Sequence, residues 1–192
     1  MMKIGIVPVI IDRFNRTEIC VDTKLLKFLN KLFPKSSIQI LLKKENVKLN
    51  LIILSGGNNI INFSKKKTDI LRSSFDDYFL KKAIKKNILI LGICHGAQFI
   101  AKKFNSIIIK KKHIGSHKIF LTNKKYSKTV NSYHNFIITK SGPKLKVLAK
   151  AHDKSIESFM YKKKVLGILW HPERYRKIKN FDIKFIKKHL CN

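Results

Sequence analysis

Cysteine is scarce in this sequence of 192 residues, which contains only Cys20, Cys94 and Cys191. An odd number of cysteines, in a chain without a recognisable signal peptide, argues against a disulfide framework and for a reducing compartment. No pair of cysteines or histidines in the sequence is interpreted as a metal site from its spacing. We therefore expect a cytoplasmic protein with no bound metal and no organic cofactor.

Long apolar runs are also lacking. No stretch approaches the ~18 consecutive apolar residues that a membrane-spanning helix needs. Residues 2–11 are apolar with a single lysine, but they have no small-residue cleavage site, which favours a first strand over a signal peptide. The sequence thus predicts no association with a membrane.

Acidic residues and arginine are few. Eleven Asp and Glu residues stand against 42 Lys and Arg, so the net charge is +31, yet only five of the basic residues are arginine. The lysines are scattered in pairs and triplets, as at residues 65–67, 110–112 and 162–164. This scatter is typical of solvated helix faces and strand ends, so we expect no specific nucleic-acid partner. The positive charge instead favours small anionic substrates.

The sequence does contain an alternation of apolar strands and amphipathic helices. Buried strands are predicted at residues 3–11, 37–42, 49–54 and 88–93, with helices at 25–33, 69–86 and 97–104. Shorter strands follow at 106–110, 118–122, 129–132, 147–151, 156–161 and 165–170, before a helix at 181–190. The first part indicates a doubly wound parallel sheet, and the later strands indicate an antiparallel extension. We expect one α/β domain, residues 1–192, with a mostly parallel sheet in three α/β/α layers.

Residues 113–117 interrupt the predicted strands as a loop or bend. This segment places Gly115 between His113 and His117. Histidines in such a segment are more often exposed or hydrogen-bonded than ligands, so we expect no ligand role for either.

The segment Gly92-Ile93-Cys94-His95-Gly96 stands between a predicted buried strand and a predicted helix. This is the layout of a nucleophile elbow with cysteine in place of serine, because the strained turn needs neighbours without side chains. A sulfur there faces the helix N-terminus, whose dipole favours a thiolate. The alternative is a buried structural cysteine at a strand end.

Two further segments end predicted strands with residues that carry chemistry. Gly56 and Gly57 follow the strand at 49–54, where backbone N–H groups of a second loop could complete an oxyanion hole; the alternative is an ordinary turn. His171-Pro172-Glu173 follows the strand at 165–170. A cysteine nucleophile needs a base and the base an orienting carboxylate, which these residues supply; the alternative is a surface turn.

Taken together, residues 54–58, 92–98 and 167–173 resemble the class I glutamine amidotransferase-like proteins, and the resemblance covers nearly the whole chain. It implies a flavodoxin-like sheet and a triad in which Cys94 is the nucleophile, His171 the base and Glu173 its orienting group. It also implies an oxyanion hole from the backbone N–H groups of Gly57 and His95. Residues that the resemblance places against the substrate are Gly56, Asn58, Gln98, Ser132, Tyr133 and His134.

Within this group the chain resembles the gamma-glutamyl hydrolase branch. Val130-Asn131-Ser132-Tyr133-His134 is similar to a stretch of the gamma-glutamyl-gamma-aminobutyrate hydrolases, as are Arg72 with Phe75-Asp76 and residues 151–159. The size and the 130–135 stretch look most like gamma-glutamyl-CDP-amidate hydrolases of bacterial surface-polysaccharide modification. The implied reaction is hydrolysis of a gamma-glutamyl amide, releasing glutamate through a thioester.

Two alternatives stay open. One is a glutaminase subunit that supplies ammonia to a separate synthase partner, and the other is a non-catalytic binding protein that keeps the fold. Two residues depart from the branch. His95 stands where Leu or Arg is frequent, and Phe136 stands where the aminobutyrate-hydrolase relatives often have Gln.

Overall fold

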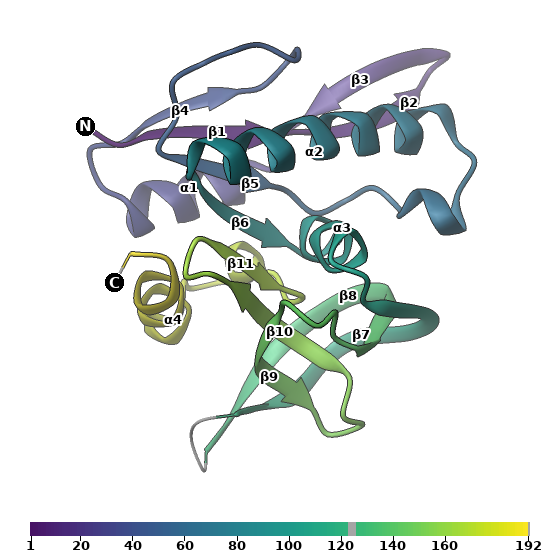
Figure 1. Cartoon of the computed structure of the whole chain (residues 1–192), viewed down its shortest axis with the longest axis vertical. Coiled ribbons are helices and arrows are strands. Elements are labelled where there is room, and N and C mark those ends of the chain that lie inside the picture. Colours follow the sequence, from purple (N-terminus) through teal and green to yellow (C-terminus); the bar gives the residue numbers. More distant parts are fainter. Residues whose placement is uncertain (123–125, 192) are drawn as a thin grey trace.

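The structure is a computed structural model of the chain, and it describes residues 1–122 and 126–191. Across these residues runs a nine-stranded sheet with the order β4-β1-β5-β6-β11-β10-β8-β7-β9 (Figure 1). The first five strands are parallel: β4 (Ser37–Ile40), β1 (Lys3–Val7), β5 (Leu51–Leu54), β6 (Leu89–Ile93) and β11 (Val165–Ile168). Numbered along the chain, they lie in the order 2-1-3-4-5. This is the doubly wound order that the sequence predicted.

Helices cover both faces of the parallel strands (Figure 1). The helices are α1 (Thr23–Leu32), α2 (Lys67–Lys86), α3 (His95–Lys103) and α4 (Asn180–Leu190). Because side chains alternate along a strand, Ile53 of β5 joins the core with Phe28 of α1 and Phe185 of α4, while Ile52 joins the core with Phe79 of α2 and Ile100 of α3. Each fully buried apolar side chain of this size contributes about 1.5–3 kcal/mol, so the two cores fix the parallel strands between them.

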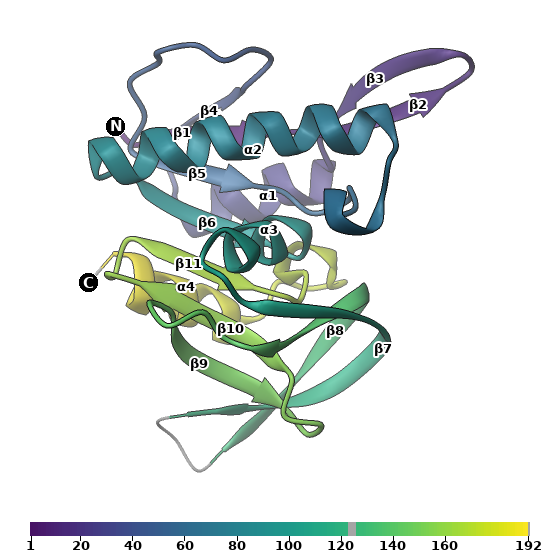
Figure 2. The ribbon, with the colours of Figure 1, turned by 45° about the vertical axis from the view of Figure 1, so that its right-hand side comes forward.

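The other four strands form an antiparallel half that is larger than expected. They are β7 (Ile107–Leu121), β8 (Ser127–Lys140), β9 (Lys146–Ala151) and β10 (Ile156–Tyr161). Figure 2 shows them at the opposite end of the molecule from strands β2 and β3. β9 pairs with both β7 and β10, and β8 also pairs with β7 and β10, so the four strands close on one another. The predicted antiparallel extension is therefore present, but with five parallel and four further antiparallel strands the sheet is only about half parallel.

The strand predicted at residues 3–11 is in fact two strands. β1 ends at Val7, and Pro8 separates it from β2 (Val9–Arg13), which forms a hairpin with β3 (Arg16–Cys20) outside the main sheet. Proline has no N–H group to donate to a ladder, so it ends the pairing there. Phe14 and Asn15 turn the hairpin with φ of 50° and 58°.

The loop predicted at residues 113–117 is wrong as well, because β7 continues through it. His113 pairs with His134 of β8, and Gly115 pairs with Ser132. Glycine tolerates the φ of +102° that Gly115 adopts, so it sits within the strand without ending it. One face of the paired strands is exposed to solvent here. The segment is therefore rich in polar residues, and its composition resembles that of a loop.

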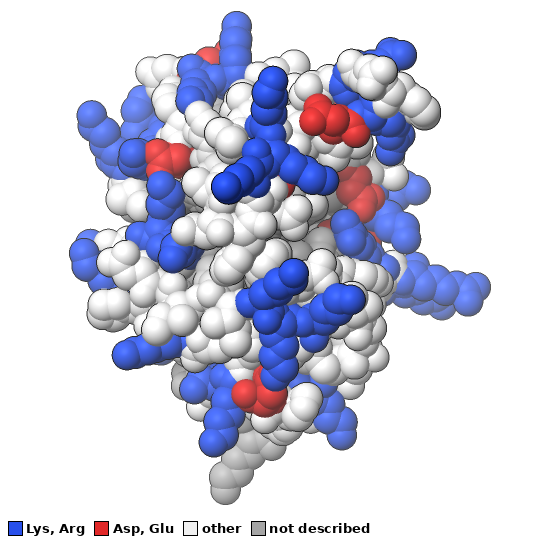
Figure 3. Space-filling view, turned by 90° about the vertical axis from the view of Figure 1, so that its right-hand side faces the viewer, with Lys and Arg blue, Asp and Glu red and all other residues white. Residues whose placement is uncertain are grey.

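Basic side chains are spread over the surface. In Figure 3, Lys and Arg form separate groups across one face with uncharged surface between them. No continuous basic stripe is visible on that face, which agrees with the scatter of lysine along the sequence. Within the described part of the chain, no helix has the length and apolar character needed to cross a membrane.

Candidate active site

Cys94 occupies a strained turn between β6 and α3. Its φ is 49° and ψ −103°, which L-residues rarely adopt, and the turn is held by hydrogen bonds on both sides. The Cys94 N–H donates to the Ile168 carbonyl at 2.8 Å, and the Gln98 N–H donates to the Cys94 carbonyl at 2.9 Å. A Cβ on Gly96 would lie 2.0 Å from the Leu54 carbonyl oxygen, so only glycine lets α3 pack this closely on β5.

His171 and Glu173 meet Cys94 from the end of β11. His171 Nδ1 lies 2.6 Å from Glu173 Oε1, and both side chains are buried. The imidazole also interacts with the side chain of Cys94. Burial disfavours the charged ring, but the Cys94 thiolate and the Glu173 carboxylate outweigh it and raise the pKa of His171 to about 9. The site therefore favours the protonated form of the His171 ring.

Asn131 of β8 fixes the backbone of His171. Its side-chain amide donates to the His171 carbonyl at 2.8 Å, and its side-chain oxygen accepts from the His171 N–H at 2.8 Å. The backbone N–H of Asn131 in turn donates to the Tyr175 hydroxyl oxygen. Asn131 is not among the site residues predicted from the sequence, although it lies inside the 130–134 stretch.

The glycines after β5 make room for the triad. A Cβ on Gly56 would lie 2.7 Å from His171 Cε1 and 3.4 Å from the Cβ of Cys94. Gly57 has a φ of +122°, which also favours glycine. At Gly56 the backbone of this loop therefore approaches His171 and Cys94 closely.

A cavity of about 240 Å³ opens beside Cys94. Its lining comes from four regions that are distant in sequence: Gly57, Asn58, Asn59, Cys94, Gln98, Tyr133, His134, Asn135, Phe136, His171 and Arg174. The Tyr133 ring lies edge-on to His171, with centroids 5.5 Å apart, and the Arg174 guanidinium lies over that tyrosine ring at 5.3 Å. The cavity thus joins the Cys94 thiol to a cationic, aromatic rim.

The predicted substrate residues divide into two groups. Tyr133 lines the cavity with an exposed ring, whereas the amide of Asn58 is engaged by both backbone groups of Ile10 and by Asp69. Gln98 also lines the cavity, and its Nε2 donates to the Phe136 carbonyl at 2.9 Å. Ser132 lies outside the cavity lining, and its hydroxyl donates to the carbonyl of His113. Asn58 and Ser132 hold the framework in this structure.

A buried ionic network supports the turn after Cys94. Arg72 of α2 is fully buried and its Nε lies 3.0 Å from Asp76 Oδ1. The same carboxylate contacts the His95 ring, with 2.9 Å between Nε2 and Asp76 Oδ2. Arg72 also donates to the carbonyls of Pro8 and Ser55. The network therefore ties α2, the end of β5 and the start of α3 together.

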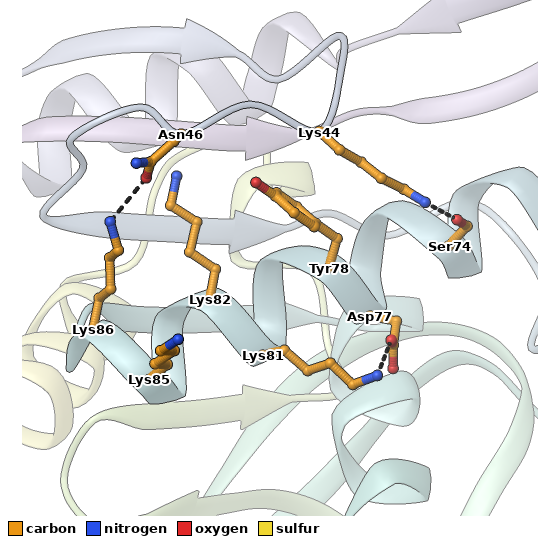
Figure 4. A pocket seen from close by; sticks show the side chains of 9 residues that line it. All are labelled: Lys44, Asn46, Ser74, Asp77, Tyr78, Lys81, Lys82, Lys85 and Lys86. Carbon is orange, nitrogen blue, oxygen red and sulfur yellow. Dashed lines mark hydrogen bonds and ion pairs between the residues drawn. The ribbon is translucent and has the colours of Figure 1, made fainter.

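A second, larger hollow of about 560 Å³ lies between α2 and the segment before β5. Lysines dominate it, but Figure 4 shows several of them turned toward neighbouring protein atoms. Lys86 donates to Asn46, Lys82 donates to two backbone carbonyls, and Lys81 pairs with Asp77. No cysteine or histidine is among the residues that line it. The chemistry-bearing side chains are gathered at the smaller cavity.

The fold and this site define an α/β protein whose cysteine, histidine and glutamate meet at the carboxyl ends of a doubly wound sheet. The chain belongs to the class I glutamine amidotransferase family, whose profile matches residues 9–190. This confirms the family that the three sequence segments indicated.

Individual relatives agree with this assignment. The chain is 39% identical over 134 residues to a gamma-glutamyl-CDP-amidate hydrolase of Campylobacter jejuni; the match covers 69% of this chain and 66%, just under two thirds, of the relative. It is 27% identical over 181 residues to a candidate glutamine amidotransferase-like protein of Lactococcus lactis, covering 76% of this chain and 77% of the relative. A glutamine amidotransferase structure from Thermotoga maritima has the same fold, with a TM-score of 0.67, 16% identity and coverage of 90% and 76%.

Proposed function

We propose that this protein hydrolyses a gamma-glutamyl amide bond and releases glutamate through a thioester on Cys94. The observation that carries the proposal is the contact of Cys94 with His171, whose other ring nitrogen is fixed by Glu173. A thiolate held beside an imidazolium at a strained strand-to-helix turn is the arrangement that thiol-dependent acyl transfer needs. The name of the Campylobacter jejuni relative supports the gamma-glutamyl group as the acyl part.

Acylation begins when the Cys94 thiolate attacks the gamma-carbonyl carbon, forming a C–S bond and an oxyanion. The oxyanion collapses, the C–N bond breaks, and the proton on His171 Nε2 moves to the departing nitrogen. Glu173 holds the ring in the tautomer that keeps Nε2 aimed at Cys94. The products of this step are the gamma-glutamyl thioester and a free amine.

Deacylation reverses the roles. His171, now neutral, takes a proton from a water molecule whose oxygen attacks the thioester carbon. Collapse of this second oxyanion breaks the C–S bond, so glutamate leaves and Cys94 returns with the proton on His171. Apart from the substrate and water, the two steps need no group from outside the chain.

The oxyanion is assigned to the backbone N–H groups of Gly57 and His95. His95 is the first residue of α3, where N–H groups have no partner within the helix. Gly57 lines the same cavity from the loop after β5. One such donor is typically worth about 3 kcal/mol in the transition state.

The rim of the cavity fits an anionic, aromatic leaving group. Arg174 offers a guanidinium that suits phosphate oxygens, and about half of the Tyr133 ring is exposed beside it. We propose a gamma-glutamyl-nucleotide amidate as the substrate, with the nucleotide phosphates near Arg174. The net charge of +31 would also attract such an anion.

The test is glutamate release from a panel of gamma-glutamyl amides, including one linked to cytidine diphosphate, with free glutamine as the comparison. Cys94→Ala should lose all turnover while the fold is kept, and Cys191→Ala, which changes an exposed thiol, should be as active as the parent. A glutamine-analogue electrophile should add once to the parent and to Cys191→Ala, and not to Cys94→Ala.

Each outcome decides between named alternatives. Turnover by Cys94→Ala would disprove the nucleophile. Preference for glutamine, or release only when a synthase is added, would indicate the amidotransferase subunit instead. Failure of Cys94 to react with the electrophile in folded protein would favour a binding protein without catalysis.

A further inference from the structure

Three imidazoles converge on one buried carboxylate in the antiparallel half of the sheet. Glu157 of β10 is 1% exposed, and its Oε1 lies 3.3 Å from His117 Nε2, 3.5 Å from His113 Nδ1 and 3.7 Å from His134 Nε2. His113 and His117 point from β7, and His134 points from β8 directly opposite His113. Four side chains from three strands therefore share one small volume.

These facing atoms meet only as ion-pair contacts of 3.3–3.7 Å, without the geometry of regular hydrogen bonds. The three facing nitrogens of the imidazoles and both carboxylate oxygens of Glu157 are buried and unsatisfied, although they are close together. Buried polar atoms nearly always make hydrogen bonds of good geometry in native proteins, so buried atoms that meet only through such long contacts point to an occupant between them. An occupant that suits three ring nitrogens and a carboxylate at once is a cation.

The outer nitrogens of two rings are fixed in the way that metal-binding histidines usually are. His113 Nε2 lies 3.0 Å from Asp153 Oδ2, and His134 Nδ1 lies 3.0 Å from the Phe136 carbonyl oxygen. An N–H on each of these outer atoms leaves the inner nitrogen with a free lone pair aimed at Glu157. Carboxylate and carbonyl partners of this kind set the tautomer of metal-ligating histidines.

The distances from Glu157 to the three imidazoles are close to those of a tetrahedral site. Zinc bonds nitrogen and oxygen at about 2.0–2.1 Å, which puts neighbouring tetrahedral ligands about 3.3–3.4 Å apart. The distances from Glu157 Oε1 are 3.3, 3.5 and 3.7 Å, and ligand atoms of His113, His134 and Glu157 all lie within 4.8 Å of one another. We propose that His113, His117, His134 and Glu157 bind one divalent transition-metal ion, with zinc the best match.

This revises the expectation from sequence that His113 and His117 are not ligands. They are four residues apart, and on a strand such residues share a face because side chains alternate. Because the segment was predicted as a loop, the sequence did not indicate that the two side chains share a face. Four protein ligands leave no open position, so the site is structural. It would join β7, β8 and β10 next to Tyr133 and thereby hold one wall of the cavity.

Metal content measures the site without any reference to hydrolysis. Untagged Cys94→Ala protein is the parent, so that the thiol of the candidate active site cannot contribute. After chelation and reconstitution with zinc alone, we expect about one zinc per chain in the parent. We expect at least a tenfold loss in Glu157→Gln and in His117→Asn. His152→Asn is the matched control, because His152 is an exposed histidine of the neighbouring turn.

Thermal unfolding gives the second readout. Saturating zinc should raise the Tm of the chelated parent and of His152→Asn by about 5 °C or more, and should leave the Tm of His117→Asn unchanged. If Glu157→Gln does not fold, as judged by circular dichroism, His117→Asn decides, because its side chain is only partly buried. A folded parent that binds no zinc, or zinc retained by His117→Asn, would overturn the proposal. In that case protons or a water molecule would satisfy the polar atoms of the cluster.

Discussion

Asn131 holds the main chain of His171 through two hydrogen bonds of 2.8 Å, one to the carbonyl oxygen and one from the N–H group. These two hydrogen bonds take the place of strand pairing at the point where β11 has ended and Pro172 follows. The imidazole is thus positioned from two sides, by Asn131 through the backbone and by Glu173 through the ring.

The substitution Asn131→Ala should lower kcat by about 100-fold, because small displacements of a catalytic group are costly and the His171 backbone would lose its clamp. KM should change little, since Asn131 is not among the residues that line the cavity. Steady-state kinetics of the variant, with Asn46→Ala on an exposed loop as control, separate the two constants. Equal losses of kcat and of folded protein would show that Asn131 acts only on stability.

The pH dependence of turnover should reveal the state of His171. Because its pKa is raised to about 9, the ring stays protonated from neutral pH up to about pH 9. This is the proton that the leaving amine needs. The rate should therefore hold up to about pH 9 and fall as the pH rises through it. In Glu173→Gln the ring loses one source of that shift, so the basic limb should move to lower pH. A limb that stays in place would contradict the role of Glu173.

Asp182 of α4 should destabilise the protein above about pH 6. Burial raises the pKa of Asp182 to about 6, although its hydrogen bond from Trp170 opposes the rise. The folded state then binds the proton more tightly than the unfolded state, so stability is greatest at low pH and is lost as the pH rises through 6. Asp182→Asn should therefore gain up to about 3 kcal/mol at pH 8 and little at pH 4.

Thermal unfolding between pH 4 and pH 8 measures this directly. Asp12→Asn, which changes an exposed carboxylate, is the control. The same difference in Tm at both pH values would mean that the effect of Asp182→Asn is steric and has no link to ionisation.

Two adjacent aspartates of α2 should differ sharply in their contribution to stability. Asp76 is fully buried between Arg72 and His95, whereas Asp77 pairs with Lys81 and Lys103 at the surface. Asp76→Ala leaves a buried guanidinium without its partner and should cost about 3–5 kcal/mol. Asp77→Ala should cost less than about 1 kcal/mol. Denaturant unfolding compares the pair, and similar costs would contradict the importance of burial.

The strand ends that carry the candidate triad could be predicted because their signals are local. Gly92 and Gly96 flank Cys94 in the sequence, and Pro172 directly follows His171, so each motif is visible within a few residues even though Gly96 is required by contact with Leu54 of β5. Buried parallel strands are also distinct from other segments because they are apolar throughout. The parallel half of the fold and the meeting of Cys94 with His171 follow from these features.

The antiparallel half could not be predicted in the same way. Its long strands β7 and β8 alternate between a buried and a solvated face, so their polar residues resembled loops. The same alternation explains the mixed outcome for residues 131–134. Asn131 and Tyr133 lie against His171, whereas Ser132 and His134 contact β7 and β10. The role of each of these residues depends on which face of its strand is buried. That face can be predicted only when the neighbouring strands are known.

The mutual pairing of β7, β8, β9 and β10 also bears on solubility. β9 hydrogen-bonds to strands on both of its sides, but only residues 119–121 of β7 pair with it, so over the residues described the rest of β7 pairs on one side only, with β8. Exposed edges are templates for aggregation, and isoleucine-rich strands such as the one containing Ile107 and Ile109 would be hazardous ones. The short β4 remains as the other edge. Closure through β9 therefore covers only the end of β7, and the edge beside Ile107 and Ile109 is paired with β8 alone.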